Sequence, residues 1–595
     1  MGKNCSSTLY PFFSWLRKNR SEMAAEIAIT PSQYNFTLLF LFFLLLFIVP
    51  CKPTKDYDEP KILVYGTTPN TLLSNDGSLP SLARRPVSPD PNLTNCASIK
   101  PFIGNRTIIN CCPPVSHNIM DFKLPINPIV KVRPAAHSVN ATYLENYKEA
   151  IRRMKALPPN DPRNFYQQAN IHCTYCEGAY KQAGFPNLDF RIHYSWLFFP
   201  FHRWYIYFYE RILASLIKDL DPNFAIPFWN WDSPVGMQIP ACYHIDPTSP
   251  LYDSRRNPNH LPPVLINLEY DYGKKDQNTP ETNLQIMYRT VVSTSKTPTL
   301  FFGGAYRAGD YKGFSGAGGG SVEMVLHGGV HEWTGPEPAD KKANGEDMGT
   351  FYSAARDPIF YSHHANLDRL WTIWKTLGGK RKDITDSDWL ESGFLFYDEN
   401  KNLVRVKVKD CLDTTKLGYV YQDVDVPWLY VKPTPRRRSR FIGKIKEKIG
   451  VDVAHDAAGT FQENKFPLVL DSSVRTIVMR PRKTRSKKEK EEEEEVLVIE
   501  GIEFQRDLAV SFDVYINDED DVQGGPTKTE FAGSFIHMPF KHKHKQNKMK
   551  THLRLGITEL LEDLDAEDYN AILVTLVPKS GQGHVTIGGI KLEFY

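Results

Sequence analysis

LHGGVHEW (326–333) and ARDPIFYSHHANLDRLW (355–371) lie in the stretch from Glu323 to Trp374, which decides the fold. His327 and His331 are four residues apart, so on a helix their imidazoles lie one turn apart on the same face. Such a pair can hold one metal ion, although a histidine pair without metal is the commoner explanation of the spacing. Gly328 and Gly329 each cost an isolated helix about 1 kcal/mol. A substrate or a second helix close by would be a reason for small residues here and would remove this objection to a helix.

The second segment predicts a helix that supplies a third histidine. Asp357 and Pro358 suit a helix start, with the carboxylate as the cap and proline in the first turn. His364 lies in one inward stripe, whereas His363 lies on a second apolar face, so periodicity alone does not exclude His363. The stripe consists of Phe360, His364, Leu367, Trp371 and Trp374. We predict that His364 is the ligand and that Asp368 accepts its other ring N–H or pairs with Arg369.

The composition indicates a chain of two or three domains with ample material for a large core. Its 595 residues contain 72 Lys and Arg against 69 Asp and Glu, which predicts no polyanionic partner such as nucleic acid. Basic residues precede a 14-residue apolar run, Phe36 to Val49, which is typical of a signal peptide and shorter than the roughly 20 residues of a membrane span. Residues 1–50 are therefore predicted to be a targeting segment. A retained anchor, with transient membrane association, is the rival interpretation.

Residues 51–95 have the composition of a flexible pro-segment. Asn92, Asn105 and Asn140 begin glycosylation triplets, so together with the apolar run they favour the secretory route, to the vacuole or the cell exterior. Clustered cysteines in a secreted chain suggest disulfides, although the pairing does not follow from sequence. The cluster consists of Cys96, Cys111, Cys112, Cys173 and Cys176. Four of the five can pair, and one is left over.

Three further histidines form the other half of the predicted site. A helix that begins at Asp161-Pro162 carries His172, and a long aromatic helix that begins near Pro200 carries His202. His193 then lies in the loop before that helix. Six converging imidazoles with hardly an acidic residue among them point to copper or zinc. Because no nucleophile or general base typical of a zinc hydrolase accompanies them, we favour a pair of copper ions, which carries out oxygen chemistry.

From about Cys96 to Tyr595 the chain resembles the plant polyphenol oxidases of the catechol oxidase and tyrosinase family, which have a type 3 dicopper centre. The shared motifs include IHCTYCEGAY, HYSWLFFPFHRWY, PFWNWD, GEDMGTFYSAARDPIFYSHHANLDRLW and KLGYVY. The resemblance implies a mainly α catalytic domain (96–430), with a four-helix-bundle dicopper core and long loops. A small β-sandwich-like C-terminal domain follows.

The resemblance also assigns the site residues. The first copper is held by His172, His193 and His202, and the second by His327, His331 and His364. It implies a thioether between Cys176 and His193, and the disulfides Cys96–Cys112 and Cys111–Cys173. Phe351 matches a phenylalanine that restricts entry over the first copper. Glu323 matches a glutamate that orders a water near the coppers, and it is a candidate base toward the phenolic proton; without the resemblance, an exposed helix glutamate is the preferred interpretation.

The implied reaction oxidises catechols to o-quinones with reduction of O₂ to water, so the partners are O₂ and small phenols. Gly328 stands where efficient phenol hydroxylases often have asparagine, which predicts o-diphenol oxidation over monophenol hydroxylation. Glu332 could place a carboxylate near the mouth and favour amine-bearing diphenols, but a solvated charge is the preferred interpretation. Two alternatives remain open. One is a specialised hydroxylase or aurone-synthase-like enzyme, and the other is a haemocyanin-like O₂ carrier.

The C-terminal part changes in character. Residues 431–495, with their basic and acidic runs, predict a protease-sensitive linker, and alternating apolar residues in 496–595 predict a small β-domain. In relatives this domain covers the entrance, so we expect a latent enzyme. His542 and His544 resemble a further metal pair, but a charged loop is preferred. Relatives often enter the chloroplast lumen, which is the alternative destination to the secretory one.

Overall fold

The computed structural model describes residues 85–96, 98, 110–270, 279–310, 317–336, 345–433, 465–482, 484–518, 528–539 and 548–595. The predicted targeting segment, most of the pro-segment, Asn105 and the His542–His544 pair lie outside these residues. Within the described residues, no helix has both the length and the apolar character that crossing a membrane requires.

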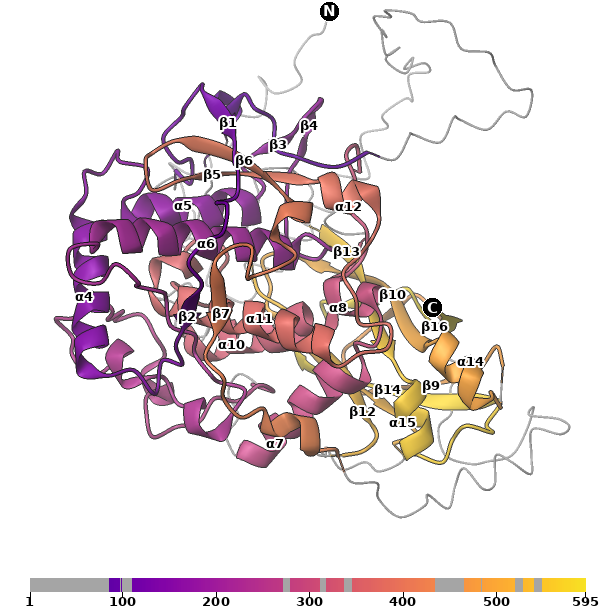
Figure 1. Ribbon diagram of the computed structural model, residues 1–595. Helices are drawn as coiled ribbons and strands as arrows, with labels where there is room; N and C mark the ends of the chain where they lie inside the picture. Colours follow the sequence, from indigo (N-terminus) through magenta and orange to yellow (C-terminus); the bar gives the residue numbers. More distant parts are fainter. Residues whose placement is uncertain are drawn as a thin grey trace, which may run out of the picture. The chain divides into compact units, whose positions relative to one another are not determined.

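A group of helices forms the centre of the first domain (Figure 1). Its members are α5 (Phe165–Cys176), α6 (Phe198–Leu216), the π-helical turn η6 (Val322–His327), which continues into α10 (Gly328–Thr334), and α11 (Ile359–Thr376). Every residue of α6 from Phe198 to Glu210 is buried. Such a helix, apolar all round, is enclosed by its neighbours, and α11 packs directly on it.

Local sequence signals explain where these helices begin. Pro200 lies in the first turn of α6, and His193 lies in the loop before it, as predicted. The Asp357 carboxylate accepts the backbone N–H of Ile359 at 2.9 Å, which caps the start of α11. The side chain of Asn164 caps α5 in the same way. These signals fix the ends of the helices that carry the histidines.

The remaining elements of the first domain surround this core. The helices are α4 (Ala141–Ala156), α7 (Pro280–Met287), the π-helical η5 (Tyr288–Ser293), α8 (Pro298–Phe302) and α12 (Ser387–Glu391). One short sheet has the strand order β1 (Ile119–Asp121), β6 (Leu403–Lys407), β5 (Gly393–Tyr397). Two further sheets have two strands each: β2 (Lys131–Arg133) pairs with β7 (Tyr419–Tyr421), and β3 (Lys181–Gln182) pairs with β4 (Phe185–Asp189).

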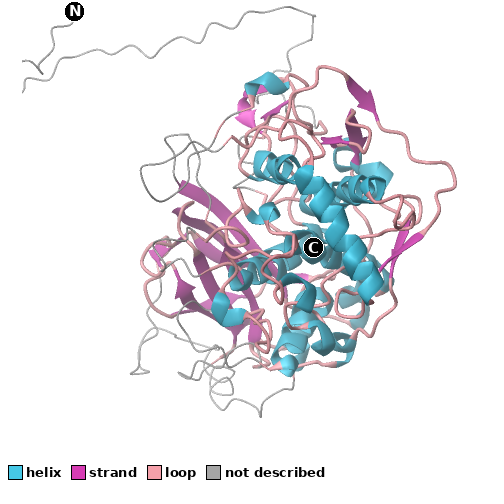
Figure 2. Cartoon of the chain, turned by 90° about the vertical axis from the view of Figure 1, so that its left-hand side faces the viewer, coloured by secondary structure: helices cyan, strands magenta, loops and turns pink. Residues whose placement is uncertain are grey.

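Residues 465–595, here called the lid, form two sheets beside the helical domain (Figure 2). One sheet has the order β13 (Lys548–Gly556), β10 (Glu495–Gln505), β15 (Thr586–Ile587), β8 (Leu468–Val469), and β16 (Gly589–Phe594) also pairs with β10. The other has the order β12 (Phe531–His537), β11 (Val510–Ile516), β14 (Ala571–Ser580), β9 (Val474–Met479). The predicted fold class, a helical domain followed by a strand-rich one, is confirmed.

The prediction of a linker up to residue 495 is wrong in its second half. β9 pairs antiparallel with β14 along six residues, so the lid already begins near residue 465. The run of lysines and glutamates that follows contains a short helix, α14 (Lys487–Glu492). This helix begins with a capping box formed by Ser486 and Glu489. Strand pairing across about a hundred residues leaves no local signal in the sequence. The run of charged residues, by contrast, is a local pattern typical of a linker, and it led to the wrong boundary.

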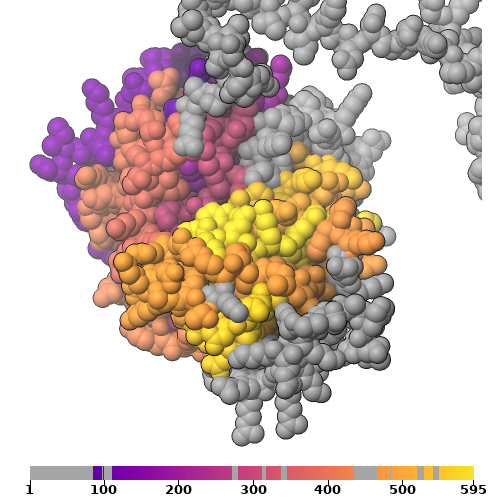
Figure 3. All heavy atoms as spheres, turned by 90° about the vertical axis from the view of Figure 1, so that its right-hand side faces the viewer, coloured from indigo at the N-terminus to yellow at the C-terminus, as the bar shows by residue number. Residues whose placement is uncertain are grey.

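The lid, drawn in orange and yellow, lies against the helical domain (Figure 3), and hydrogen bonds and ion pairs join the two. The lid helix α15 (Thr558–Asp563) carries Glu559, which accepts a hydrogen bond from the Tyr288 hydroxyl at 2.8 Å. Elsewhere Lys579 of the lid donates to the backbone carbonyl of Glu269 at 2.9 Å and lies 3.7 Å from the Asp513 carboxylate. Burial raises the pKa of Glu269 to about 8, with Lys579 opposing the shift and Asp513 adding to it.

Candidate metal centre

The first three predicted histidines converge from α5, α6 and the loop between them. The centroids of their rings lie 5.4 Å (His193 to His202), 5.6 Å (His172 to His202) and 5.7 Å (His172 to His193) apart. All three side chains are buried. A triangle of this size places three imidazoles around one point in the interior.

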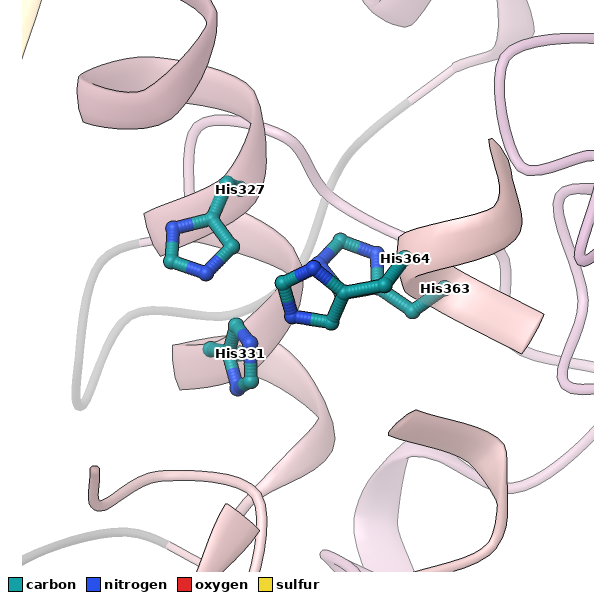
Figure 4. Close-up of side chains that lie close together, drawn as sticks. All are labelled: His327, His331, His363 and His364. Atoms are coloured by element: carbon teal, nitrogen blue, oxygen red, sulfur yellow. The ribbon is translucent and has the colours of Figure 1, made fainter. Parts of the chain in front are cut away.

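A second triangle faces the first. His327 and His331 lie on successive turns of η6 and α10, with centroids 4.5 Å apart, and His364 of α11 points toward both (Figure 4). Its ring centroid lies 5.2 Å from that of His327 and 5.7 Å from that of His331. The two triangles touch where His202 stacks on His364 at 4.0 Å. The structure therefore brings all six predicted histidines together.

The ring nitrogens of these residues suit metal binding. In His172, His202 and His331 the Nδ1 atom lies 2.7–3.1 Å from a backbone carbonyl oxygen, which fixes the proton on Nδ1. The Nε2 atoms of the six histidines are all buried without a hydrogen-bond partner. Burial lowers the pKa of each imidazole, to about 3 for His202 and about 4 for His331. Neutral rings with free nitrogen lone pairs are the form that binds copper or zinc.

His363 lies close enough to His327, His331 and His364 to be considered a ligand as well. Its Nδ1, however, lies 3.1 Å from the indole Nε1 of Trp231. An indole N–H can only donate, so Nδ1 is the acceptor and the proton of neutral His363 is on Nε2. Because neither nitrogen then has a free lone pair, the hydrogen bond to Trp231 favours His364 as the ligand.

The predicted partners of Asp368 are wrong. Its carboxylate forms an ion pair with Arg203 and accepts hydrogen bonds from the hydroxyls of Tyr419 (2.6 Å) and Tyr421 (2.5 Å). Both ring nitrogens of His364 remain without a hydrogen-bond partner. The helix spacing places Asp368 one turn from His364, but the strand β7 and the arginine of α6 come from elsewhere in the chain and take its oxygens. Asp368 therefore ties α11 to its surroundings.

A small cavity lies between the two triangles and the lid. Its lining includes the predicted residues Glu323, Gly328 and Phe351 together with His193 and His327. On the lid side, Ile536 and Met538 close it. The cavity measures about 10 Å³, which is room for about one water molecule. A phenol ring does not fit while the lid is in place.

Two glutamates are more buried than the residues alone indicate: without the resemblance Glu323 would be an exposed helix glutamate, and the preferred interpretation of Glu332 was a solvated charge. Glu323 is 4% exposed, and its Oε1 accepts the backbone N–H of Tyr194 at 2.7 Å, whereas Oε2 has no hydrogen-bond partner. Burial raises its pKa well above the usual value. Glu332 is 1% exposed and is absent from the lining of the cavity, so the solvated charge is wrong. Phe351 packs against the His193 ring with centroids 4.4 Å apart.

The cysteines follow the pattern that the resemblance implies. Disulfides join Cys96 to Cys112 and Cys111 to Cys173. Cys176 is free and buried, and its Sγ lies within 4.8 Å of a ring nitrogen of His193. Burial raises the pKa of the Cys176 thiol, so it stays protonated. The cysteine left over by the pairing is therefore the one beside the loop histidine.

Comparisons with known proteins cover both domains. Residues 162–377 match the common central domain of tyrosinase, 383–434 the polyphenol oxidase middle domain, and 466–594 the chloroplastic polyphenol oxidase C-terminal domain. A chloroplastic polyphenol oxidase of Malus domestica is 56% identical over 527 residues, which are 87% of this chain and 86% of the apple protein. The chain belongs to the plant polyphenol oxidase family.

Relatives in this polyphenol oxidase family include proteins with different names. Aureusidin synthase of Antirrhinum majus is 51% identical over 517 residues, which are 84% of this chain and 88% of the Antirrhinum protein. The structure of latent apple tyrosinase superposes with a TM-score of 0.71 at 57% identity, and it covers 80% of this chain and all of the apple chain. The lid coincides with the residues that match the polyphenol oxidase C-terminal domain, so the lid is a family feature.

Sequence reasoning missed Tyr194, Ile536 and Met538, which also line the cavity. Tyr194 directly follows the predicted ligand His193, and this position in the sequence could have indicated that it lies near the site. Ile536 and Met538 lie more than 150 residues from the nearest predicted ligand, and nothing in their local pattern distinguishes them from other strand residues.

Proposed function

We propose that this chain oxidises o-diphenols to o-quinones at two copper ions, one in each histidine triangle. The convergence of six neutral, buried imidazoles with unpartnered nitrogens supports this most directly. When bound, the copper ions supply the redox step: two diphenols and one O₂ give two o-quinones and two waters. No acidic side chain other than Glu323 lines the described cavity, which suits a pair of copper ions better than a carboxylate-bridged di-iron centre.

The residues around the cavity orient the substrate and accept its proton. Phe351, packed on His193, restricts entry to the first copper. Glu323 lines the same cavity and its Oε2 has no hydrogen-bond partner, so this carboxylate is placed to accept the proton that a phenol loses on binding.

The proposed ligands of the first copper include a histidine held by no hydrogen bond to its ring. Both nitrogens of His193 lack partners. A thioether bond to Cys176 would anchor the ring, and the closeness of Sγ to the imidazole supports this bond. It would fix the orientation that a loop residue otherwise lacks.

Gly328 supports a preference for o-diphenols over monophenols. It has no side chain to help remove the proton of a bound monophenol, and it lies on the cavity wall one residue after His327. Comparable turnover of tyrosine and a catechol would contradict the preference. The similarity to aureusidin synthase makes a specialised biosynthetic oxidase the second candidate, which a substrate profile that includes chalcones would reveal.

We infer a chloroplast destination. The relatives from Malus domestica and Vicia faba are named as chloroplastic proteins, which supports the alternative destination and gives no support to the secretory route. A fusion of the first hundred residues to a fluorescent protein tests this. Import into chloroplasts is expected, and delivery to the vacuole or cell exterior would contradict it.

The enzyme assay compares the full chain before and after proteolysis of the segment between the domains. Oxygen uptake with 4-methylcatechol is expected to be low before cleavage and high after it, because the lid leaves no space for the ring. Oxygen binding without any turnover, before and after cleavage, would instead favour an O₂ carrier.

A further inference from the structure

Tyr194 is held in an unusual backbone conformation beside the site. Its φ angle is 59°, in the left-handed region that residues other than glycine rarely adopt. The Glu323 carboxylate accepts its backbone N–H at 2.7 Å, which ties the loop of His193 to the helix of His327. The conformation directs the Tyr194 side chain along the cavity, where its ring lies 6.5 Å from that of Phe351.

The lid binds the hydroxyl of this tyrosine. Tyr194 Oη lies 2.6 Å from Nδ1 of His537, the last residue of β12. The other nitrogen of His537, Nε2, lies 3.2 Å from the carbonyl oxygen of Arg506. That carbonyl can only accept, so Nε2 carries the proton and Nδ1 is the acceptor. The Tyr194 hydroxyl therefore donates a hydrogen bond to His537 of the lid.

His537 comes into the site together with the residue that blocks it. Ile536, its neighbour, packs against Gly328 and closes the cavity, while His537 itself is fully buried. Displacement of the lid removes both at once. The cavity then opens, and the Tyr194 hydroxyl loses the acceptor that His537 provided.

We propose that Tyr194 recognises the substrate in the open enzyme. Its hydroxyl donates a hydrogen bond to an acceptor group on the ring substituent of the diphenol. His537 occupies the place of that acceptor in the closed form. The favoured substrates are o-diphenols that carry a carboxylate or carbonyl group on the ring substituent. This inference rests on the proposed function, because it concerns the substrates of the same site.

The test compares two diphenols that differ only in the acceptor group, 3-(3,4-dihydroxyphenyl)propionate and 4-ethylcatechol. The enzyme is the full chain after cleavage between the domains. Tyr194→Phe keeps the ring that faces Phe351 and removes the hydroxyl. The ratio of kcat/KM for the acid to that for 4-ethylcatechol is expected to fall about tenfold, mainly through KM, because a hydrogen bond to a charged acceptor is lost.

Tyr209→Phe is the matched control. It removes another buried tyrosine hydroxyl, one without a hydrogen-bond partner and outside the cavity lining, so the ratio should stay at the wild-type value. An unchanged ratio in Tyr194→Phe would overturn the inference. So would an unmodified enzyme that shows no preference for the acid, a measurement that needs no variant. Failure to oxidise either diphenol would instead overturn the proposed function.

Discussion

Gly328→Ala should activate the uncleaved protein, although it adds a side chain beside a closed cavity. A Cβ atom at this position would lie 3.1 Å from Cγ2 and 3.4 Å from Cβ of Ile536. Ile536 cannot yield by itself, because it lies within β12 and pairs with Ser511 of β11. The lid must therefore shift as a unit to relieve the contact.

The size of the effect follows from this contact. Overpacking by one methyl group costs about 1–3 kcal/mol, which raises the population of displaced lids by roughly 5- to 150-fold. Alanine also stabilises a helix by about 1 kcal/mol relative to glycine, but this gain is present with the lid on or off. The measured quantity is the activity of uncleaved protein divided by that of cleaved protein, so effects on catalysis cancel.

Gly329→Ala provides the control. Its Cβ would lie 2.9 Å from the carbonyl oxygen of Leu268, within the helical domain. This change should lower the melting temperature while leaving the activity ratio unchanged, because the clash exists with and without the lid. A ratio in Gly328→Ala equal to that of the unmodified chain would refute the account of how Ile536 closes the site.

Three further predictions concern the ligands, the lid and the thioether. His364→Ala should lose one of two bound copper ions, whereas His363→Ala should keep both; metal analysis of the two purified variants distinguishes them, and equal losses would contradict the tautomer argument. With the lid docked, the pKa of Glu269 is raised from its ordinary value of about 4.5 to about 8. The docked form therefore binds a proton that the displaced form has lost between these pH values. Docking of the lid should weaken as the pH rises from about 4.5 to about 8 and should not change further above pH 8. Glu269→Gln should flatten the rise of the activity ratio over this range, and an unchanged pH profile would remove Glu269 from the explanation. Peptide mass spectrometry of the copper-loaded protein should find Cys176 and His193 in one cross-linked peptide that is absent from Cys176→Ala, and two separate peptides would contradict the thioether.

The sequence was sufficient for those parts of the site that depend on local spacing. The four-residue spacing of His327 and His331, the helix start at Asp357 and the proline at the start of α6 all predict what the structure contains. Each is a property of one turn of helix or one cap. The position of His193 outside a helix followed from Pro200 for the same reason.

The parts that escaped prediction depend on contacts between distant residues. Asp368 was expected to bind a neighbour on its own helix, but its oxygens bind groups from α6 and β7. The hydrogen bond between Tyr194 and His537 spans 343 residues, and no periodicity reports such a pair. The early start of the lid was missed because β9 finds its partner, β14, only after about a hundred residues.

The central claim is that each histidine triangle holds one copper ion. Anomalous diffraction from crystals of the copper-loaded full chain, recorded on both sides of the copper absorption edge, tests it directly. The account predicts two peaks per chain, one among the rings of His172, His193 and His202 and one among those of His327, His331 and His364. A single peak, or a second ion bound by His363 in place of His364, would contradict it.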